Sequence, residues 1–235
     1  MPRPLPLSYC ADLVRKHDYD RYLCTLFAPA SVREAWFVLF AFHCEIAAIT
    51  EKVSEAMTGL LRLAWWQERL DEIYAGKVLQ GHPVAEALAK VIAEHSLPQE
   101  SFDQLLAAHE QDLQREPFAS LEELESYCRD TSAALLRLCA LCAGLEPWTG
   151  LDDLGIAWGQ IQYLHETTRD NRAAICEVVA QHTKHAQAHT PLPGMFLPFL
   201  QTCEFYLKRS HRPRSSIDHV RLIITLWWKN ITRKK

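Results

Sequence analysis

Glycine is scarce in this chain: only 8 of the 235 residues are glycine, and dipeptides typical of tight turns are few. Chains built from many short strands need such residues at each turn, so this scarcity argues against an all-β fold. Positive charge is not in excess either, because the formal net charge is −4. We therefore expect no nucleic-acid partner.

Long hydrophobic runs are missing as well. The apolar stretch Ala35–Cys44 is free of Asp, Glu, Lys and Arg, but it has about half the length that a membrane-spanning helix needs. Residues 1–7 are rich in proline and do not resemble a secretory signal. We expect no transmembrane segment and a cytoplasmic location.

The eight cysteines are scattered through helical patterns, without the context of a secreted protein. They are expected to be reduced and buried as small hydrophobic side chains. Cys139 and Cys142 have the spacing of a redox motif, but their leucine neighbours favour packing in the core. No Gly-rich phosphate loop, Gly-x-Ser-x-Gly elbow or His-Glu-x-x-His helix occurs in the sequence.

Helical periodicity is what the sequence does contain. Apolar residues recur at the spacing of one helical face through most of the chain. The predicted helices cover about residues 7–27, 31–52, 54–75, 83–95, 98–116, 120–144, 152–170, 173–189, 199–210 and those from 217 onwards. Because no long linker divides them, we expect one all-α domain over residues 1–235.

The predicted helix from Ser31 to Lys52 is apolar on nearly every side. Ser31 and Glu34 have the spacing of a capping box, which predicts the start of the helix. Ser120 and Glu123 repeat that spacing further along the chain. A helix that is apolar all round must be surrounded by other helices or line a hydrophobic cavity.

Several stretches together resemble the squalene/phytoene synthase family, whose members condense two prenyl diphosphates head to head. In the family's order and spacing, these stretches are Tyr19–Tyr22, Leu26–Pro29, Arg33–Ala35, Val53–Glu55, Arg62–Trp66, Leu70–Gly76, His82–Ala85, Tyr127 with Thr131–Ala133, Gly155–Gly159, Tyr206–Arg209 and Leu226–Trp228. The resemblance implies an isoprenoid-synthase fold, a helical bundle round a central apolar cavity.

The resemblance also implies a Mg²⁺ site, because active members carry two Asp-x-x-x-Asp motifs on facing helices. This spacing puts two carboxylates on one helical face, where they can hold Mg²⁺ against a diphosphate. The first motif falls on Ala47–Glu51, so that Ala47 replaces the leading aspartate and Glu51 closes the motif. Glu51 is then either a single remaining ligand or a solvated charge near a helix end. Cys44 stands where many active members carry an arginine.

The second motif falls on residues 162–170. Gln162, Glu166 and Asp170 follow one another at four-residue spacing and would share one face of the predicted helix 152–170. These side chains can bind Mg²⁺. The alternative is that the acids face water or pair with neighbouring arginines.

Relative to the family pattern, the chain is shortened by some tens of residues after about residue 172. This loss and Ala47 together argue against head-to-head condensation. Cys44–Ala47 and Val53–Glu55 resemble a branch of the family similar to mitochondrial complex I assembly factors.

We therefore expect a catalytically degenerate member that binds a protein partner, or a prenyl or other lipid ligand, with no catalytic residue and no cofactor. The first alternative is an active prenyltransferase that uses Mg²⁺ with Glu51, Gln162, Glu166 and Asp170. The second alternative is a plain helical scaffold with a filled interior.

Two further groups of residues have possible binding roles. His182, His185 and His189 lie on one side of a predicted helix and can bind Zn²⁺, but no nearby Cys or Asp in the sequence completes a ligand set, which favours packing and solvent exposure. Trp227 and Trp228 precede a basic tail, a combination that suits peripheral association with a membrane; the favoured alternative is a packed final helix with a frayed basic tail.

Overall fold

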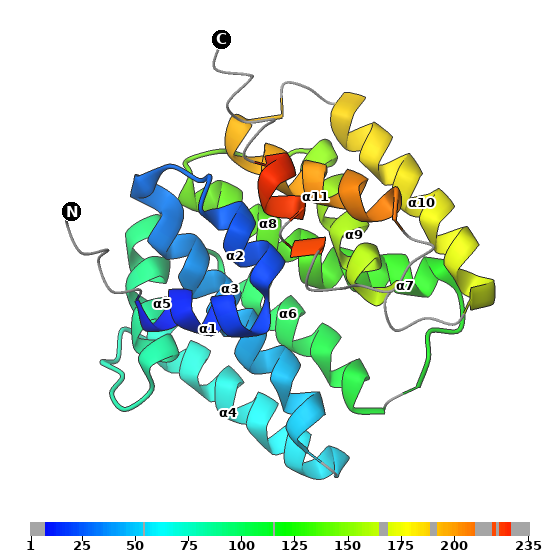
Figure 1. Cartoon of the computed structure of the whole chain (residues 1–235). Helices are drawn as coiled ribbons and strands as arrows, with labels where there is room; N and C mark the ends of the chain where they lie inside the picture. Colours follow the sequence, from blue (N-terminus) through cyan, green and yellow to red (C-terminus); the bar gives the residue numbers. More distant parts are fainter. Residues whose placement is uncertain are drawn as a thin grey trace. The chain divides into compact units, whose positions relative to one another are not determined.

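The computed structural model describes residues 8–53, 55–114, 116–164, 169–188, 192–209, 218–219 and 221–226, without the side chains of Glu51 and residues 169–171. Within these ranges the secondary structure is helical and contains no strand, which confirms the all-α prediction (Figure 1). No helix in the described part of the chain is long and apolar enough to cross a membrane.

The helices group into two compact units. The first contains α1 (Tyr9–His17), α2 (Tyr19–Thr25), α3 (Ala30–Lys52), α4 (Ala56–Tyr74), α5 (Pro83–His95), α6 (Gln99–Gln111) and the 3-10 turn η1 (Asp112–Gln114). The second contains α7 (Leu121–Cys128), the π-helical turn η2 (Arg129–Ala133), α9 (Thr149–Tyr163), α10 (Arg169–Ala188), η3 (Gly194–Phe196), α11 (Leu197–Leu207) and the helical residues 221–226. Helix α8 (Ala134–Cys142) begins in the second unit and ends in the first. A single domain over the whole chain stays a prediction.

Helix α3 is the central helix of the first unit, as its apolar composition predicts. It packs against α1, α2, α4, α5 and α6 (Figure 1). Trp36, Phe40 and Phe42 are fully buried, and the indole N–H of Trp36 donates to the carbonyl oxygen of Cys139 at 2.9 Å. Burying each large aromatic side chain contributes roughly 2 to 3 kcal/mol relative to leaving it exposed, so this helix organises the core of its unit.

Helix α9 has the same role in the second unit, where it packs against α7, η2, α10 and α11. Two glycines four residues apart allow one side of α9 to approach η2 closely. A Cβ atom added at Gly155 would meet the backbone of Ala133, and one added at Gly159 would lie 2.7 Å from the Sγ atom of Cys128. The second unit therefore depends on the absence of a side chain at these two positions.

Several helix starts differ from the sequence prediction, among them those of α9 at Thr149 and α10 at Arg169, which were expected at 152 and 173. Two of the differences have a local explanation. The expected helix 7–27 is broken at Asp18, whose carboxylate accepts a hydrogen bond from the backbone N–H of Arg21 at 3.0 Å and so begins α2. Ser31 does not cap α3, because the helix already begins at Ala30 with Pro29 at the N-cap position. Ser120 is confirmed as an N-cap, since its hydroxyl accepts from the backbone N–H of Glu123 at 3.2 Å. The Glu123 carboxylate accepts from the backbone N–H of Ala119 at 2.6 Å, one residue before the partner that a capping box uses.

The predicted helix 152–170 also ends early. Helix α9 stops at Tyr163, and Asp170 belongs to the next helix, α10. The sequence between them contains Thr167 and Thr168, two β-branched residues of low helix propensity. The second motif is therefore not presented by one continuous helix.

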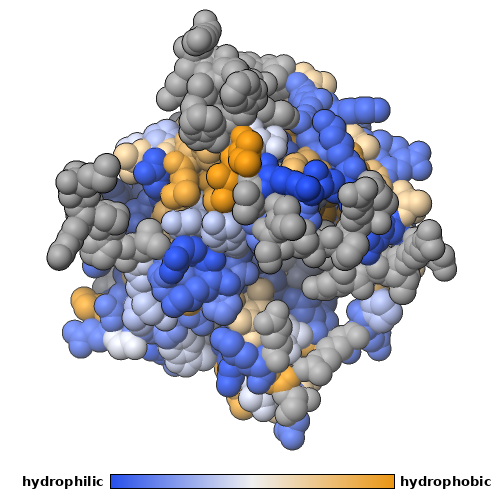
Figure 2. Space-filling model, viewed as in Figure 1, coloured by the Kyte–Doolittle hydropathy of each residue, from blue (hydrophilic) through white to orange (hydrophobic). Residues whose placement is uncertain are grey.

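The view in Figure 2 is mostly hydrophilic, with a hydrophobic patch where Figure 1 draws the helical residues 221–226. Within that segment the side chains of Ile223 and Ile224 are exposed, whereas Leu222 and Leu226 are buried. Residues 227–235, with the two tryptophans predicted to favour a membrane surface, lie outside the described residues.

Candidate functional site

The first-motif positions lie in the C-terminal half of α3. Cys44 is buried, and Ala47 and Ala48 are half-buried on the neighbouring turn. Glu51 belongs to the last turn of α3, but its side chain is outside the described residues. This face of the helix therefore offers a thiol and methyl groups at positions where the family pattern has an arginine and an aspartate.

The second-motif positions are divided between α9 and α10. Gln162 is half-buried near the end of α9, Glu166 lies outside the described residues, and Asp170 is in the first turn of α10, where its side chain is not described. Gln162 and Asp170 thus do not share a single helical face. The two-turn ligand face predicted from sequence spacing is interrupted.

The residues at the first motif do not fit Mg²⁺ binding. Magnesium prefers oxygen ligands in a nearly octahedral arrangement and is usually held by one or two carboxylates together with substrate phosphates. Ala47 has no donor atom, and burial raises the pKa of the Cys44 thiol to about 12, with a further contribution from Asp18. A neutral thiol at that position neither binds Mg²⁺ nor provides the planar cation that grips a phosphate. The spacing of the motif along one helix fixes which residue occupies each position. The missing metal ligand at Ala47 can therefore be recognised from the sequence alone.

A buried amide close to the second motif was not anticipated. The side chain of Gln160 is fully buried in α9, and neither its nitrogen nor its oxygen has a hydrogen-bond partner in the described part of the chain. A buried amide without partners costs roughly 1 to 3 kcal/mol, so it needs a compensating role or is a source of instability.

The first unit contains a cavity of about 280 Å³. It is lined by Glu45, Ile49, Lys52, Arg62, Trp65, Trp66 and His82. The rings of Trp65 and Trp66 each lie 5.1 Å from the His82 ring, which gives the cavity an aromatic wall. Its volume is just below the range for small-molecule sites, roughly 300 to 1,000 Å³.

This cavity uses a different side of α3 from the first motif. At 100° per residue, Glu45, Ile49 and Lys52 are rotated by roughly a third of a turn from the face that carries Cys44 and Ala47. A predicted helix alone could not reveal the cavity, because its other walls come from α4 and from His82, the N-cap residue of α5. The cavity combines aromatic surface with charges of both signs.

A polar cluster is buried beside α3 in the same unit. The Arg21 guanidinium donates to Asp18 at 2.7 Å and lies 3.4 Å from Nδ1 of His43. Nδ1 of His109 lies 2.7 Å from a carboxylate oxygen of Asp112, and the His109 ring packs edge-on against His43. Burial, together with the positive charges of Arg21 and His109, holds the pKa of His43 well below 6.5. His43 is therefore neutral at physiological pH.

The cysteines behave as the sequence predicted. All eight are free, and all except the half-buried Cys176 are buried. Burial raises the pKa of Cys10 and that of Cys142 to about 12, and it also raises the pKa of Cys139. The Cys139/Cys142 pair is thus confirmed as part of the core and has none of the thiolate character that redox chemistry requires.

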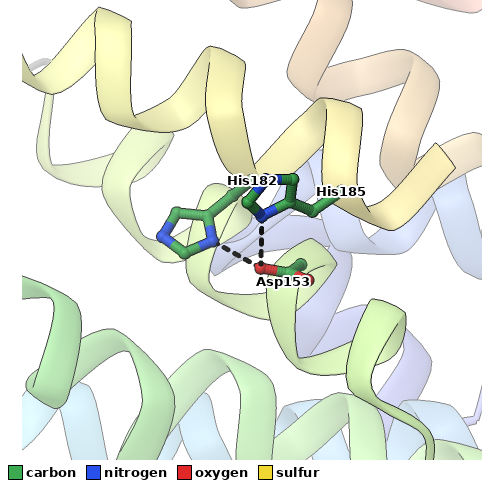
Figure 3. A group of neighbouring side chains, drawn as sticks. All are labelled: Asp153, His182 and His185. Atoms are coloured by element: carbon green, nitrogen blue, oxygen red, sulfur yellow. Dashed lines mark hydrogen bonds and ion pairs between the residues drawn. The ribbon is translucent and has the colours of Figure 1, made fainter. Parts of the chain in front are cut away.

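The histidines of α10 have a partner that the sequence did not reveal. Asp153, on α9, brings a carboxylate oxygen to within 2.6 Å of His182 Nδ1 and 3.8 Å of His185 Nδ1 (Figure 3). The expectation that no acid completes a ligand set was wrong, because α9 and α10 pack together and join residues 29 positions apart. His189 lies outside the described residues.

Comparison with known structures identifies the fold. The structure is similar to a dehydrosqualene synthase in complex with a ligand, with a TM-score of 0.74 and 14% sequence identity over 97% of this chain and 96% of that one. Squalene synthase HpnC from Alicyclobacillus acidocaldarius gives a TM-score of 0.72 and 19% identity over 87% of this chain and 94% of that one. The architecture is the all-α isoprenoid-synthase fold.

Sequence comparison gives the family. The squalene/phytoene synthase profile matches residues 14–190, and the chain belongs to that family. Complex I assembly factor 6 from Bos taurus is 29% identical over 252 residues, which cover 90% of this chain and 75% of the relative. The phytoene synthase of Arthrospira platensis is 24% identical over 157 residues, covering 66% of this chain and 48% of that enzyme.

The alignment with the bovine protein is relevant to the prediction that this chain is shorter than the family pattern. Its 252 aligned residues exceed the 235 residues of this chain, so the bovine relative contains residues that this chain lacks.

Proposed function

We propose that this protein has lost head-to-head prenyl condensation and acts by binding a protein partner, in a role like that of a complex I assembly factor. The observation that carries the proposal is Ala47 at the position of the leading metal-binding aspartate. An alanine methyl cannot hold Mg²⁺, and without the metal the negative charge of a departing diphosphate is not neutralised.

Three further features support this proposal. Cys44 is a buried neutral thiol where an arginine would assist phosphate binding. Gln162 and Asp170 belong to separate helices, so the second motif lacks a continuous ligand face. The similarity to complex I assembly factor 6 extends over 90% of the chain in both the bovine and the human protein, whereas the phytoene synthases of Arthrospira platensis and Rhodobacter capsulatus match 66% and 71% of it.

A prenyl or other lipid chain is the alternative ligand for a binding protein of this family. The aromatic wall of the cavity at Trp65 and Trp66 favours an apolar occupant. Extraction of the purified protein with organic solvent, followed by mass spectrometry, tests this alternative. A stoichiometric isoprenoid in the extract would support lipid binding, and its absence would leave the protein partner as the sole ligand class proposed.

The rival function is an active Mg²⁺-dependent prenyltransferase, for which the sequence retains Glu51, Glu166 and Asp170. To separate the two functions, the purified chain is incubated with Mg²⁺ and farnesyl or geranylgeranyl diphosphate, and released pyrophosphate is measured. An active phytoene synthase serves as the positive control. We expect no release above background, and turnover that Glu166→Ala abolishes would overturn the proposal.

The binding role has its own experiment. The tagged full-length chain is expressed in cells that contain complex I, and an active phytoene synthase is used as a bait of the same fold. We expect complex I subunits to co-purify with this chain and not with the enzyme. Equal recovery with both baits would contradict a specific role in complex I assembly.

A further inference from the structure

The side chains of Asp153, His182 and His185 converge between α9 and α10 in the second unit (Figure 3). His182 and His185 are three residues apart, which places both imidazoles on the same face of α10. Asp153 faces them from the first half of α9, and one ligand atom from each residue lies within 4.8 Å of the other two. Neither family motif includes these positions.

We propose that these three residues form a binding site for a divalent transition metal, with Zn²⁺ as the preferred ion. Two imidazole nitrogens and one carboxylate oxygen are a ligand set that zinc commonly uses. The same set disfavours Mg²⁺ and Ca²⁺, which prefer oxygen ligands alone. The site is therefore chemically distinct from the Mg²⁺ site of the active family members.

The distances suit such a site after small side-chain rotations. Ligands held at about 2.0 to 2.1 Å from a tetrahedral zinc ion lie roughly 3.3 Å from one another. The Asp153–His182 pair is closer, at 2.6 Å, because the imidazole N–H donates directly to the carboxylate, and the Asp153–His185 pair is wider, at 3.8 Å. Binding of the metal displaces the Nδ1 proton of His182 to the solvent, lengthens the Asp153–His182 separation and shortens the Asp153–His185 separation.

Glu125, on α7, supplies a second feature of a built metal site. Its carboxylate lies 3.5 Å from Nε2 of His182, on the side of the ring opposite to Asp153. When His182 binds metal through Nδ1, its Nε2–H is left on the side where this carboxylate lies, and a small side-chain rotation would bring the two within hydrogen-bond distance. A carboxylate is a usual outer-shell partner of a metal-bound histidine. Arg129 donates to the same carboxylate at 2.7 Å and holds it in place.

Solvent access leaves room for a fourth ligand. The side chain of His185 is 66% exposed, whereas Asp153 and His182 are only 13% and 12% exposed. The metal therefore has a partly buried base and an open side that water can occupy. Because the ligands come from two helices, bound zinc would fasten α10 to α9.

The competing explanation is that a protonated His182 sits between two carboxylates as an ion pair and binds no metal. In that arrangement His185 contributes little, because it is exposed and is 3.8 Å from Asp153. The two explanations thus differ in the effect of replacing His185. They also differ in whether added metal changes the stability of the folded chain.

The experiment uses the full-length chain after treatment with a chelator, which is then removed. Zn²⁺ is titrated against a chromophoric competitor, and the thermal midpoint is measured with and without the ion. We expect one equivalent to bind and to raise the midpoint. His185→Asn should weaken binding at least about tenfold, and Glu125→Gln about tenfold to a hundredfold, as for other outer-shell carboxylates.

His17→Asn is the matched control, because His17 is an exposed histidine at the end of α1. It should bind Zn²⁺ as the wild type does. Absence of binding to the wild type, or equal affinity in wild type and His185→Asn, would overturn the proposal. Since His185 is exposed, its replacement leaves the fold intact, and circular dichroism verifies this before the titration.

Discussion

A methyl group added at Gly155 should destabilise the second unit, because α9 approaches the backbone of η2 at this residue. In Gly155→Ala the new Cβ would lie 2.6 Å from the Cβ of Ala133 and 2.7 Å from its backbone nitrogen, and closer still to its Cα. Ordinary contacts between carbon atoms are about 3.5 to 4.0 Å. Relief of this clash requires α9 and η2 to separate by roughly 1 Å, because backbone atoms cannot rotate away.

The net cost follows from two opposing terms. Overpacking costs about 1 to 3 kcal/mol, and we take the upper end, about 3 kcal/mol, because the clash involves backbone. Replacement of a helical glycine by alanine recovers about 1 kcal/mol. The expected loss is therefore about 2 kcal/mol in the free energy of unfolding, or about 4 to 8 °C in the thermal midpoint of a chain of this size.

Urea unfolding monitored by circular dichroism measures this loss, with two substitutions as controls. In Gly59→Ala the new Cβ meets the end of the flexible Leu113 side chain, so a smaller loss is expected. Nothing lies within 4 Å of a Cβ added at Gly194, so Gly194→Ala should be neutral or slightly stabilising. A Gly155→Ala protein within 0.5 kcal/mol (on the order of measurement error) of the wild type would refute the argument from close approach.

Three other outcomes are expected. First, the His43 imidazole stays neutral in the folded chain, whereas in the unfolded chain it binds a proton below about pH 6.5. The free energy of unfolding should therefore fall as the pH drops below that value, by at most about 1.4 kcal/mol per pH unit. His43→Gln should show a shallower decline in urea unfolding between pH 6.5 and 5, and parallel profiles would contradict the assignment. Second, a thiol-reactive chromophore should label one cysteine rapidly in the native protein, Cys176, and the buried cysteines only after unfolding; rapid labelling of several thiols would show that the core opens readily. Third, Gln160→Met should raise the free energy of unfolding by about 1 to 2 kcal/mol, because it removes a buried amide that lacks partners in the described part of the chain. A loss of stability would instead show that the amide has a partner.

Local sequence signals determined much of the fold. Helix α5 runs from Pro83 to His95 as predicted, since proline at its first position and an apolar face define it locally. The boundaries of α3 were predicted to within one residue, because an apolar stretch of that length has few other solutions. The errors fell where weak local preferences compete, as at Asp18, which ends one helix and starts the next.

Some features of the candidate site could likewise be predicted from the sequence, and others could not. The loss of a metal ligand at Ala47 was evident from the sequence, because motif spacing along a single helix fixes which residue occupies each position. The interruption between Gln162 and Asp170 was not, since it depends on where α9 stops.

The approach of Asp153 to His182 was beyond the sequence altogether. Their helices touch because α10 packs along α9, and no periodicity encodes contacts between residues 29 positions apart. The sequence by itself thus determined the helices, the buried thiols and the missing ligand. Only the tertiary structure decided which side chains meet across helices, because packing between elements, and not propensity within them, sets those distances.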